Sequence, residues 1–212
     1  DAGDVDSMRA LGPMYIGGRG VGRDAASGID WLRRAAEKGS TGAELDLSQL
    51  YLNGAPSVPK DRPEAMKWLG ASAAHGDVTA MVNLGYMAVN GSADSPADLV
   101  LGYCWLVRAA MVDQPDAQEK LSMLFSDGAK DNHGVVIAPD LVQADLWFRV
   151  AARSPYHENT QIRAHIEPQL TTDQLSQAKR LFEAWQPRVV EQVRTLTIPL
   201  PPLAHGACPP MR

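Results

Sequence analysis

A periodic tryptophan constrains this chain more than any other feature of its sequence. Tryptophan is usually the rarest aromatic residue, yet the 212 residues include 5 Trp, 5 Tyr and only 3 Phe. Four of the five tryptophans are separated by 37, 37 and 42 residues; they are Trp31, Trp68, Trp105 and Trp147. An aspartate lies seven residues before each of them, at Asp24, Asp61, Asp98 and Asp140. A fixed period of this length indicates tandem structural repeats.

A second set of positions recurs in step with the tryptophans. A leucine with a small residue four places before it and a glycine seven places after it occurs in four copies: Leu11, Leu47, Leu84 and Leu121. Residues four apart share one face of a helix. Glycine commonly ends a helix, and aspartate commonly caps the start of one. Each copy therefore predicts two helices, one before the glycine and one after the aspartate.

These residues resemble the Sel1-like repeat family, an α-solenoid related to tetratricopeptide repeats. The first copy carries the resemblance in Leu11–Gly12, Tyr15, Gly18–Val21, Asp24, Gly28, Trp31, Ala35–Ala36 and Gly39. The resemblance extends over about residues 3–159 in four units. The third unit is degenerate, with Ala88 in place of the aromatic residue, and the fourth is expanded. A plain tetratricopeptide array is the other candidate, although its repeat is nearer 34 residues.

The predicted fold class is all-α: a right-handed α-solenoid of about four helix-turn-helix repeats, a C-terminal capping helix and an extended Pro-rich tail. The repeats are expected over residues 3–39, 40–76, 77–113 and 114–159, within a repeat region of residues 1–159. Residues 160–190 form the capping region, where an amphipathic helix from Thr171 to Trp185 covers the last apolar face. Residues 191–212 form the tail, whose prolines favour polyproline II. The tail either packs along the solenoid or docks on a partner.

The composition and motifs exclude several classes of function. A net charge of −5 provides no cationic footprint for nucleic acid, and no apolar run approaches the roughly 20 residues that span a bilayer. The glycines around Gly18 lack the rest of a phosphate-binding motif. The histidines lack metal-ligand spacing, and no nucleophile motif is present. We therefore predict no catalytic residue, no metal and no cofactor, and we interpret the recurrent tryptophans as core residues.

The two cysteines leave one question open. Cys104 directly precedes Trp105 in a predicted helix, so a small buried thiol is the first expectation. A bridge to Cys208 is the alternative, and it requires the tail to fold back. The resembled family includes Cys-rich secreted members, some described as β-lactamase-like, that staple each repeat with a disulfide. This chain lacks those paired cysteines, so a hydrolase of that kind is the least favoured function.

Partner binding is predicted on the concave face, which the first helix of each repeat lines in a solenoid. Placing the recurrent leucine in the core directs a mixture of amides, one aromatic and one lysine toward that face. The candidates are Gln49, Asn53, Asn83, Tyr86, Asn90 and Lys120. This mixture suits an extended peptide, although ordinary solvated residues have a similar composition. We hypothesise that Asn83, Tyr86 and Asn90 form part of a peptide groove.

The long fourth loop, residues 129–139, is a second candidate, because insertions in repeat proteins often carry function. His133, Val135 and Val136 are its predicted contact residues. Alternatively, the valines pack beneath the array.

The predicted function is a non-catalytic protein–protein interaction module, an adaptor, scaffold or regulator that uses the concave face, the fourth loop or the tail. The alternative is a structural accessory subunit of a larger membrane-associated or enzymatic complex. Members of the resembled family act as adaptors and scaffolds, and many bacterial ones are secreted or periplasmic. The chain begins at Asp1 rather than Met, which fits export. A periplasmic or other extracytoplasmic location is therefore expected, with the cytoplasm as the alternative.

Overall fold

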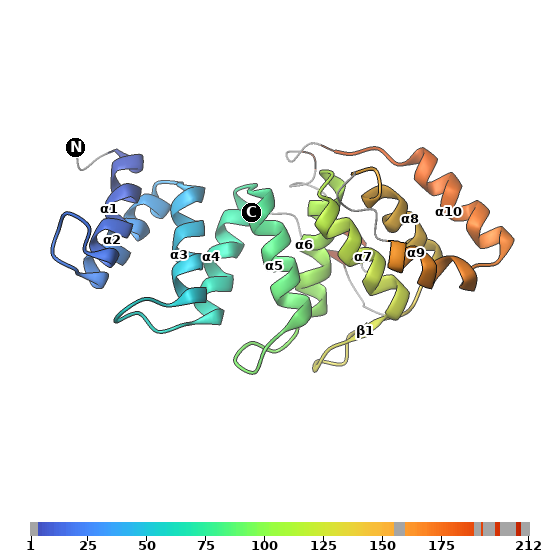
Figure 1. Ribbon diagram of the computed structural model, residues 1–212, viewed down its shortest axis with the longest axis horizontal. Helices are drawn as coiled ribbons and strands as arrows, with labels where there is room; N and C mark the ends of the chain where they lie inside the picture. Colours follow the sequence, from blue (N-terminus) through green and yellow to red (C-terminus); the bar gives the residue numbers. More distant parts are fainter. Residues whose placement is uncertain (1–3, 155–159, 189–191, 193–197, 200–206, 209–212) are drawn as a thin grey trace. The chain divides into compact units, whose positions relative to one another are not determined.

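Consecutive helices pair as hairpins in the computed structural model, which describes residues 4–154, 160–188, 192, 198–199 and 207–208 (Figure 1). The chain forms two units, Asp1–Ala80 and Met81–Arg212. Each unit is described by itself below. The described residues are mostly helical, in agreement with the all-α prediction.

The first unit contains two complete helix hairpins. Its helices are α1 (Val5–Gly17), α2 (Ala25–Glu37), α3 (Thr41–Asn53), α4 (Arg62–Ala74) and the first residues of α5 (Val78–Asn90). α1 packs on α2, α2 on α3, and α3 on α4. The core between them is made of small and aliphatic side chains, among them Met8, Leu32, Ala35, Ala43 and Leu47.

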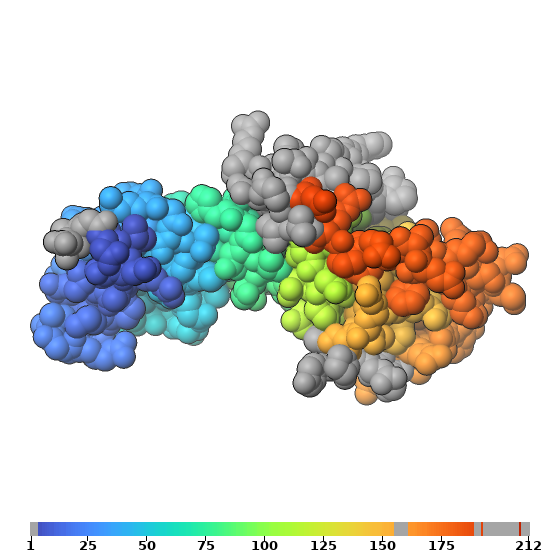
Figure 2. All heavy atoms as spheres, turned by 90° about the horizontal axis from the view of Figure 1, so that it is seen from above, coloured from blue at the N-terminus to red at the C-terminus, as the bar shows by residue number. Residues whose placement is uncertain are grey.

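The second unit continues the helical pattern and adds short strand pairs. Its helices are the rest of α5, α6 (Leu99–Met111), α7 (Pro115–Asp127), α8 (Leu141–Ala151), α9 (Thr160–Ile166) and α10 (Thr172–Ala184). α10 packs against α8, and Figure 2 shows the orange-red atoms of this part of the chain against yellow and orange atoms of the preceding residues. Thr171 caps α10 in a capping box with Gln174.

Two antiparallel strand pairs in the second unit were not expected from the sequence. β1 (Ala129–Lys130) pairs with β2 (Val136–Ile137) inside the fourth loop. β3 (Ile198–Pro199) pairs with β4 (Ala207–Cys208) in the tail. The prediction of polyproline II is therefore wrong for residues 198–199, which form a strand. Pro199 is tolerated there because an edge strand does not need its missing N–H. The rest of the tail lies outside the described residues.

Each recurrent aspartate joins the two helices of its hairpin through two kinds of hydrogen bond. Its carboxylate accepts hydrogen bonds from backbone N–H groups in the first turn of the following helix, at 2.8 to 3.1 Å. Its own backbone N–H donates to a carbonyl near the end of the preceding helix, at 2.7 to 2.9 Å. The aspartates are Asp24, Asp61, Asp98 and Asp140, and their carbonyl acceptors are Tyr15, Tyr51, Ala88 and Phe125. One residue thus satisfies an unpaired donor of one helix and an unpaired acceptor of the other.

In the first three repeats, the residue after the recurrent tryptophan is the deeply buried one. Leu32, Leu69 and Leu106 are at most 2% exposed, whereas the tryptophans before them are half-buried. A cation lies over each of these three rings, 5.2 to 5.6 Å from the centroid. Trp147 differs, because it is only 7% exposed. The tryptophans therefore line the edge of the core in three repeats and enter it in the fourth.

Cys104 is buried as expected, but it is not a free thiol. It forms a disulfide with Cys208 in β4, which fastens the described end of the tail to α6. The neighbouring face of α6 is also covered: Cys104, Val107 and Arg108 are all at most 3% exposed. The equivalent residues of α2 are Asp30, Arg33 and Arg34, which are exposed. β4 contacts α6. The residues on this face of α6 are therefore less charged than their exposed equivalents on α2.

Replacing both cysteines by serine is expected to lower the free energy of unfolding by about 2–4 kcal/mol, because the bridge closes a long loop in the unfolded chain. The bridged residues are 104 positions apart. Thermal denaturation of Cys104→Ser with Cys208→Ser, with and without reductant, measures this effect. Reductant should shift the wild type toward the double variant and leave the variant unchanged. Two free thiols in the oxidised wild type, detected by alkylation and mass spectrometry, would contradict the assignment.

Candidate functional site

A groove of about 330 Å³ lies between α1 and α3 in the first unit. Its floor is apolar and includes Ile16, Leu32 and Leu50. The α3 side carries two of the predicted contact residues, Gln49 and Asn53, which lie one helical turn apart. Gly17 and Gly54, at the ends of α1 and α3, also line the groove.

The polar groups around this groove differ in how far they are already satisfied. Asp46 is held by Arg9, whose Nε and Nη2 donate to the two carboxylate oxygens at 2.6 and 3.2 Å. Gln49 and Asn53 are exposed, and their side-chain amides make no hydrogen bond to any described residue. The groove therefore presents two available amides above an apolar floor.

Three further predicted residues come together in the second unit. Lys120 Nζ donates to Asn90 Oδ1 at 3.0 Å and lies 5.4 Å from the centroid of the Tyr86 ring. The Tyr86 hydroxyl donates to the backbone carbonyl of Asp116 at 3.0 Å. Burial raises the pKa of Tyr86 to about 12, with smaller contributions from the nearby carboxylates of Asp116 and Glu119. Burial also lowers the pKa of Lys120.

This arrangement, the Tyr86 cluster (Tyr86, Asn90 and Lys120), already uses its polar groups internally. Asn83 is exposed on the same helix and takes no part in the hydrogen bonds of the cluster. A ligand at the cluster would have to exchange with the Lys120–Asn90 bond, whereas a ligand at Gln49 and Asn53 meets free amides. A peptide would therefore find free hydrogen-bonding groups in the first unit and internally paired ones at the Tyr86 cluster of the second.

The fourth loop is organised around a residue that the sequence-based predictions missed. Asp131 is 6% exposed, and its carboxylate accepts three backbone hydrogen bonds, from His133 and Val135 at 2.9 Å and from Leu99 at 3.3 Å. The Leu99 bond joins the loop to the start of α6. The nearby Asn and Gly residues were the available signal, since an aspartate in such a stretch often hydrogen-bonds the backbone of a turn.

The predicted loop contacts divide between surface and interior. His133 is exposed, Val135 and Val136 are half-buried, and Ile137 is 2% exposed. Burial acts to raise the pKa of Asp131, but the backbone hydrogen bonds from Val135, Leu99 and His133 outweigh it and lower the pKa below the usual value. The loop is thus an anchored hairpin with its valines partly accessible.

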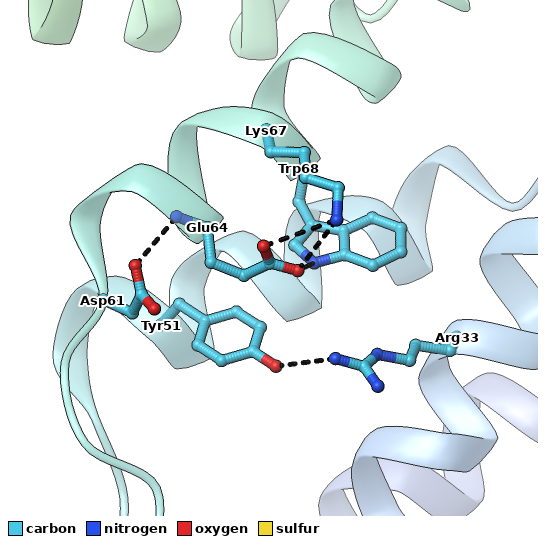
Figure 3. A network of polar contacts seen from close by, with 6 residues as sticks. All are labelled: Arg33, Tyr51, Asp61, Glu64, Lys67 and Trp68. Atoms are coloured by element: carbon cyan, nitrogen blue, oxygen red, sulfur yellow. Dashed lines mark hydrogen bonds and ion pairs between the residues drawn. The ribbon is translucent and has the colours of Figure 1, made fainter.

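The tryptophan of the second repeat belongs to a polar network in the first unit, shown in Figure 3. Trp68 Nε1 donates to Glu64 Oε1 at 3.0 Å, and Lys67 Nζ contacts the same carboxylate at 3.3 Å. Asp61 caps the Glu64 backbone N–H, and nearby Arg33 donates to the Tyr51 hydroxyl at 3.3 Å. Because the indole N–H already has a partner, the network supports a structural role for Trp68.

Among the described residues, no group of three or more His, Cys, Asp or Glu side chains could hold a metal ion. A search of the same residues for membrane spans finds no helix with the length and apolar character to cross a bilayer.

Comparison with known proteins identifies the repeats. A family model described as "Sel1 repeat" matches residues 5–40, 41–77, 78–112 and 115–156. A Sel1 repeat protein of Oxalobacter formigenes is similar in structure, with a TM-score of 0.69 and 25% identity over 84% of this chain and 52% of the other. The protective antigen c5321 of uropathogenic Escherichia coli, which displays an SLR fold, has a TM-score of 0.44 and 24% identity over 90% and 47% of the two chains. No curated protein sequence matches. The chain spans about half the length of these two solved structures.

Replacing Asp131 by asparagine is expected to lower the free energy of unfolding by about 1–3 kcal/mol at neutral pH, because a charge-assisted acceptor of the buried Leu99 N–H is lost. The pKa of Asp131 is lowered in the folded chain. Its stabilising effect is therefore complete above the unfolded value of about 3.9 and disappears as the pH falls through the folded pKa. Urea denaturation from pH 7 to pH 2 should show wild type and variant converging in acid.

Asp94→Asn is the matched control, because Asp94 is an exposed aspartate of the α5–α6 loop. We expect it to change stability by less than about 0.5 kcal/mol. A difference between wild type and Asp131→Asn that stays constant with pH would contradict a stabilising carboxylate at this position.

Proposed function

Because the chain belongs to the Sel1 repeat family, whose members generally mediate protein–protein interaction and are generally non-enzymatic scaffolds, we propose that it is a non-catalytic binding module. It takes up an extended segment of a partner protein in the groove between α1 and α3. Its role is that of an adaptor, a scaffold or a regulator of the partner.

The observation that carries this proposal is the pair of free amides above the apolar floor of the groove. An amide side chain offers both donors and an acceptor, so it can pair with the N–H and C=O groups of a peptide backbone. Residues one turn apart on a helix have Cβ atoms about 5–6 Å apart. Alternate residues of an extended peptide are about 6.8 Å apart, so Gln49 and Asn53 suit neighbouring backbone groups on one edge.

The Tyr86 cluster and the fourth loop are secondary contacts in this proposal. Lys120 and Tyr86 offer a cation and an aromatic face to a partner, at the cost of an internal hydrogen bond. Val135 and Val136 offer partly accessible apolar surface beside His133. Ile137 instead is buried and offers no surface to a partner.

Replacing Gln49 and Asn53 together by alanine is expected to weaken peptide binding about tenfold, which corresponds to two net hydrogen bonds of about 0.7 kcal/mol each. The ligands are 12-residue peptides selected from a random display library on the full chain, then synthesised with a fluorescent label. Fluorescence anisotropy measures the dissociation constants.

The matched control replaces two exposed amides of the second unit, Gln177 and Gln186, by alanine. It should leave the dissociation constants unchanged. Equal weakening by both double variants, or none by Gln49→Ala with Asn53→Ala, would contradict binding at the groove.

An extracytoplasmic location is part of the proposal. The Cys104–Cys208 bridge supports it, because disulfides persist in oxidising compartments and are rare where thiols are kept reduced. Rapid acid quenching of native cells, followed by alkylation and mass spectrometry, should recover the two cysteines as a bridged peptide pair. Recovery of both as alkylated thiols would contradict this location.

A further inference from the structure

The groove between α1 and α3 ends beside a group of unpaired cations. The α1–α2 loop contributes Arg19 and Arg23, and the α3–α4 loop contributes Lys60. All three are exposed, and none forms an ion pair with any residue that the structure describes. We refer to Arg19, Arg23 and Lys60 as the loop cations.

The loop cations lie next to the backbone that closes the groove. Arg19 lines the groove itself. Lys60 packs beside Gly54, where a Cβ added to the glycine would lie 3.2 Å from Lys60 Cγ. Arg23 packs beside Gly18 in the same way, with its Cβ 3.2 Å from such an added atom. Arg19 and Lys60 therefore border the groove at its glycine end, and Arg23 lies beside Gly18, the residue that follows Gly17.

The acidic groups nearby are already engaged. Asp46, the carboxylate that lines the groove, is paired with Arg9. Asp24 and Asp61, the aspartates of the two loops, keep their negative charge, but their carboxylates bind the N–H groups in the first turns of α2 and α4. The groove thus combines a neutralised carboxylate with cations that have no partner among the described residues.

Three cations on two neighbouring loops occur in the first unit, whereas the α7–α8 loop of the second unit carries a single lysine, Lys130. The α5–α6 loop of the second unit, residues 91–98, contains Asp94 and Asp98 and no cation. The whole chain is anionic, with a net charge of −5. A cationic groove end is therefore a local feature, and not a consequence of the overall composition.

We infer that the segment bound in this groove is an acidic peptide, with an apolar side chain over Ile16 and Leu50 and carboxylates facing the loop cations. The inference rests on the proposed function and names the chemistry of its partner. The amides at Gln49 and Asn53 hold the peptide backbone, and the loop cations select for Asp or Glu at one end. Such selection acts mainly on specificity and on the rate of association.

The test is a parallel selection from the random 12-residue display library on the full chain and on a charge-reversed variant, Arg19→Glu with Lys60→Glu. Peptides selected on the wild type should contain more Asp and Glu than Lys and Arg, and the variant should lose this preference. The dissociation constants of the wild-type peptides should rise about tenfold in the variant at low salt, and by less at 300 mM NaCl, because salt screens exposed charges.

The matched control is Lys179→Glu with Arg180→Glu on α10, which changes the net charge by the same amount at two exposed positions of the second unit. It should change the dissociation constants less than twofold. Equal loss in both variants would overturn the inference, since it would reflect total charge. A labelled 12-nucleotide single-stranded DNA that binds as tightly as the selected peptides would also overturn it. Such binding would show that the site recognises negative charge alone and does not require an apolar side chain.

The selection separates this inference from the proposed function. Selected peptides that are neutral or basic, but that depend on Gln49 and Asn53, would overturn the acidic partner and leave the binding module standing. A selection that enriches no peptide over the bare support would contradict the binding module itself, and the acidic partner with it.

Discussion

The double hydrogen bonding of the recurrent aspartate is the interaction on which each hairpin depends. The carboxylate caps the second helix while the backbone N–H binds the last turn of the first, so one residue fixes where the second helix begins relative to the end of the first. That entry point sets the rotation of the second helix, which turns Leu32 and Leu69 into the core. Close packing follows: in the first hairpin a Cβ added to Gly28 would lie 2.7 Å from the carbonyl oxygen of Gly12. The glycine is thus required by the approach of two backbones that the aspartate holds together.

Because the aspartates and the buried leucines are committed to the hairpins, differences in function must lie at positions that vary between repeats. In the first unit these positions include the groove amides and the loop cations, which lie at an open groove. The second unit varies in its longer loop, where Asp131 adds a further cap by binding the Leu99 N–H. An inserted loop normally costs conformational entropy. Here three backbone hydrogen bonds to one buried carboxylate offset part of that cost, so the hairpin can hold Val135 and Val136 in a defined place.

The repeats could be predicted from the sequence because each column of the pattern occurs four times, and each occurrence reports on the same contact. The helix pairs and the aspartate caps follow from these repeated columns, and the terminal helix follows from its own amphipathic pattern. Contacts that occur once and depend on the three-dimensional arrangement could not be found in this way. Asp131 has no counterpart in the other loops, and the Cys104–Cys208 bridge joins residues whose separation of 104 positions says nothing about their distance in space. The Lys120–Asn90 bond depends on the relative rotation of α5 and α7, which periodicity does not supply.

The two units also differ in which of their faces remain available. On α2 the residues equivalent to Cys104, Val107 and Arg108 are charged and exposed, so water covers that face at little cost. On α6 the same positions are buried, and strand β4, which is linked to α6 by the Cys104–Cys208 disulfide, contributes to covering them. Covering Cys104 and Val107 within the chain removes apolar surface that would otherwise attract unrelated proteins. Binding is then left to surfaces where polar groups set the specificity, and among these the α1–α3 groove combines free amides, an apolar floor and unpaired charge.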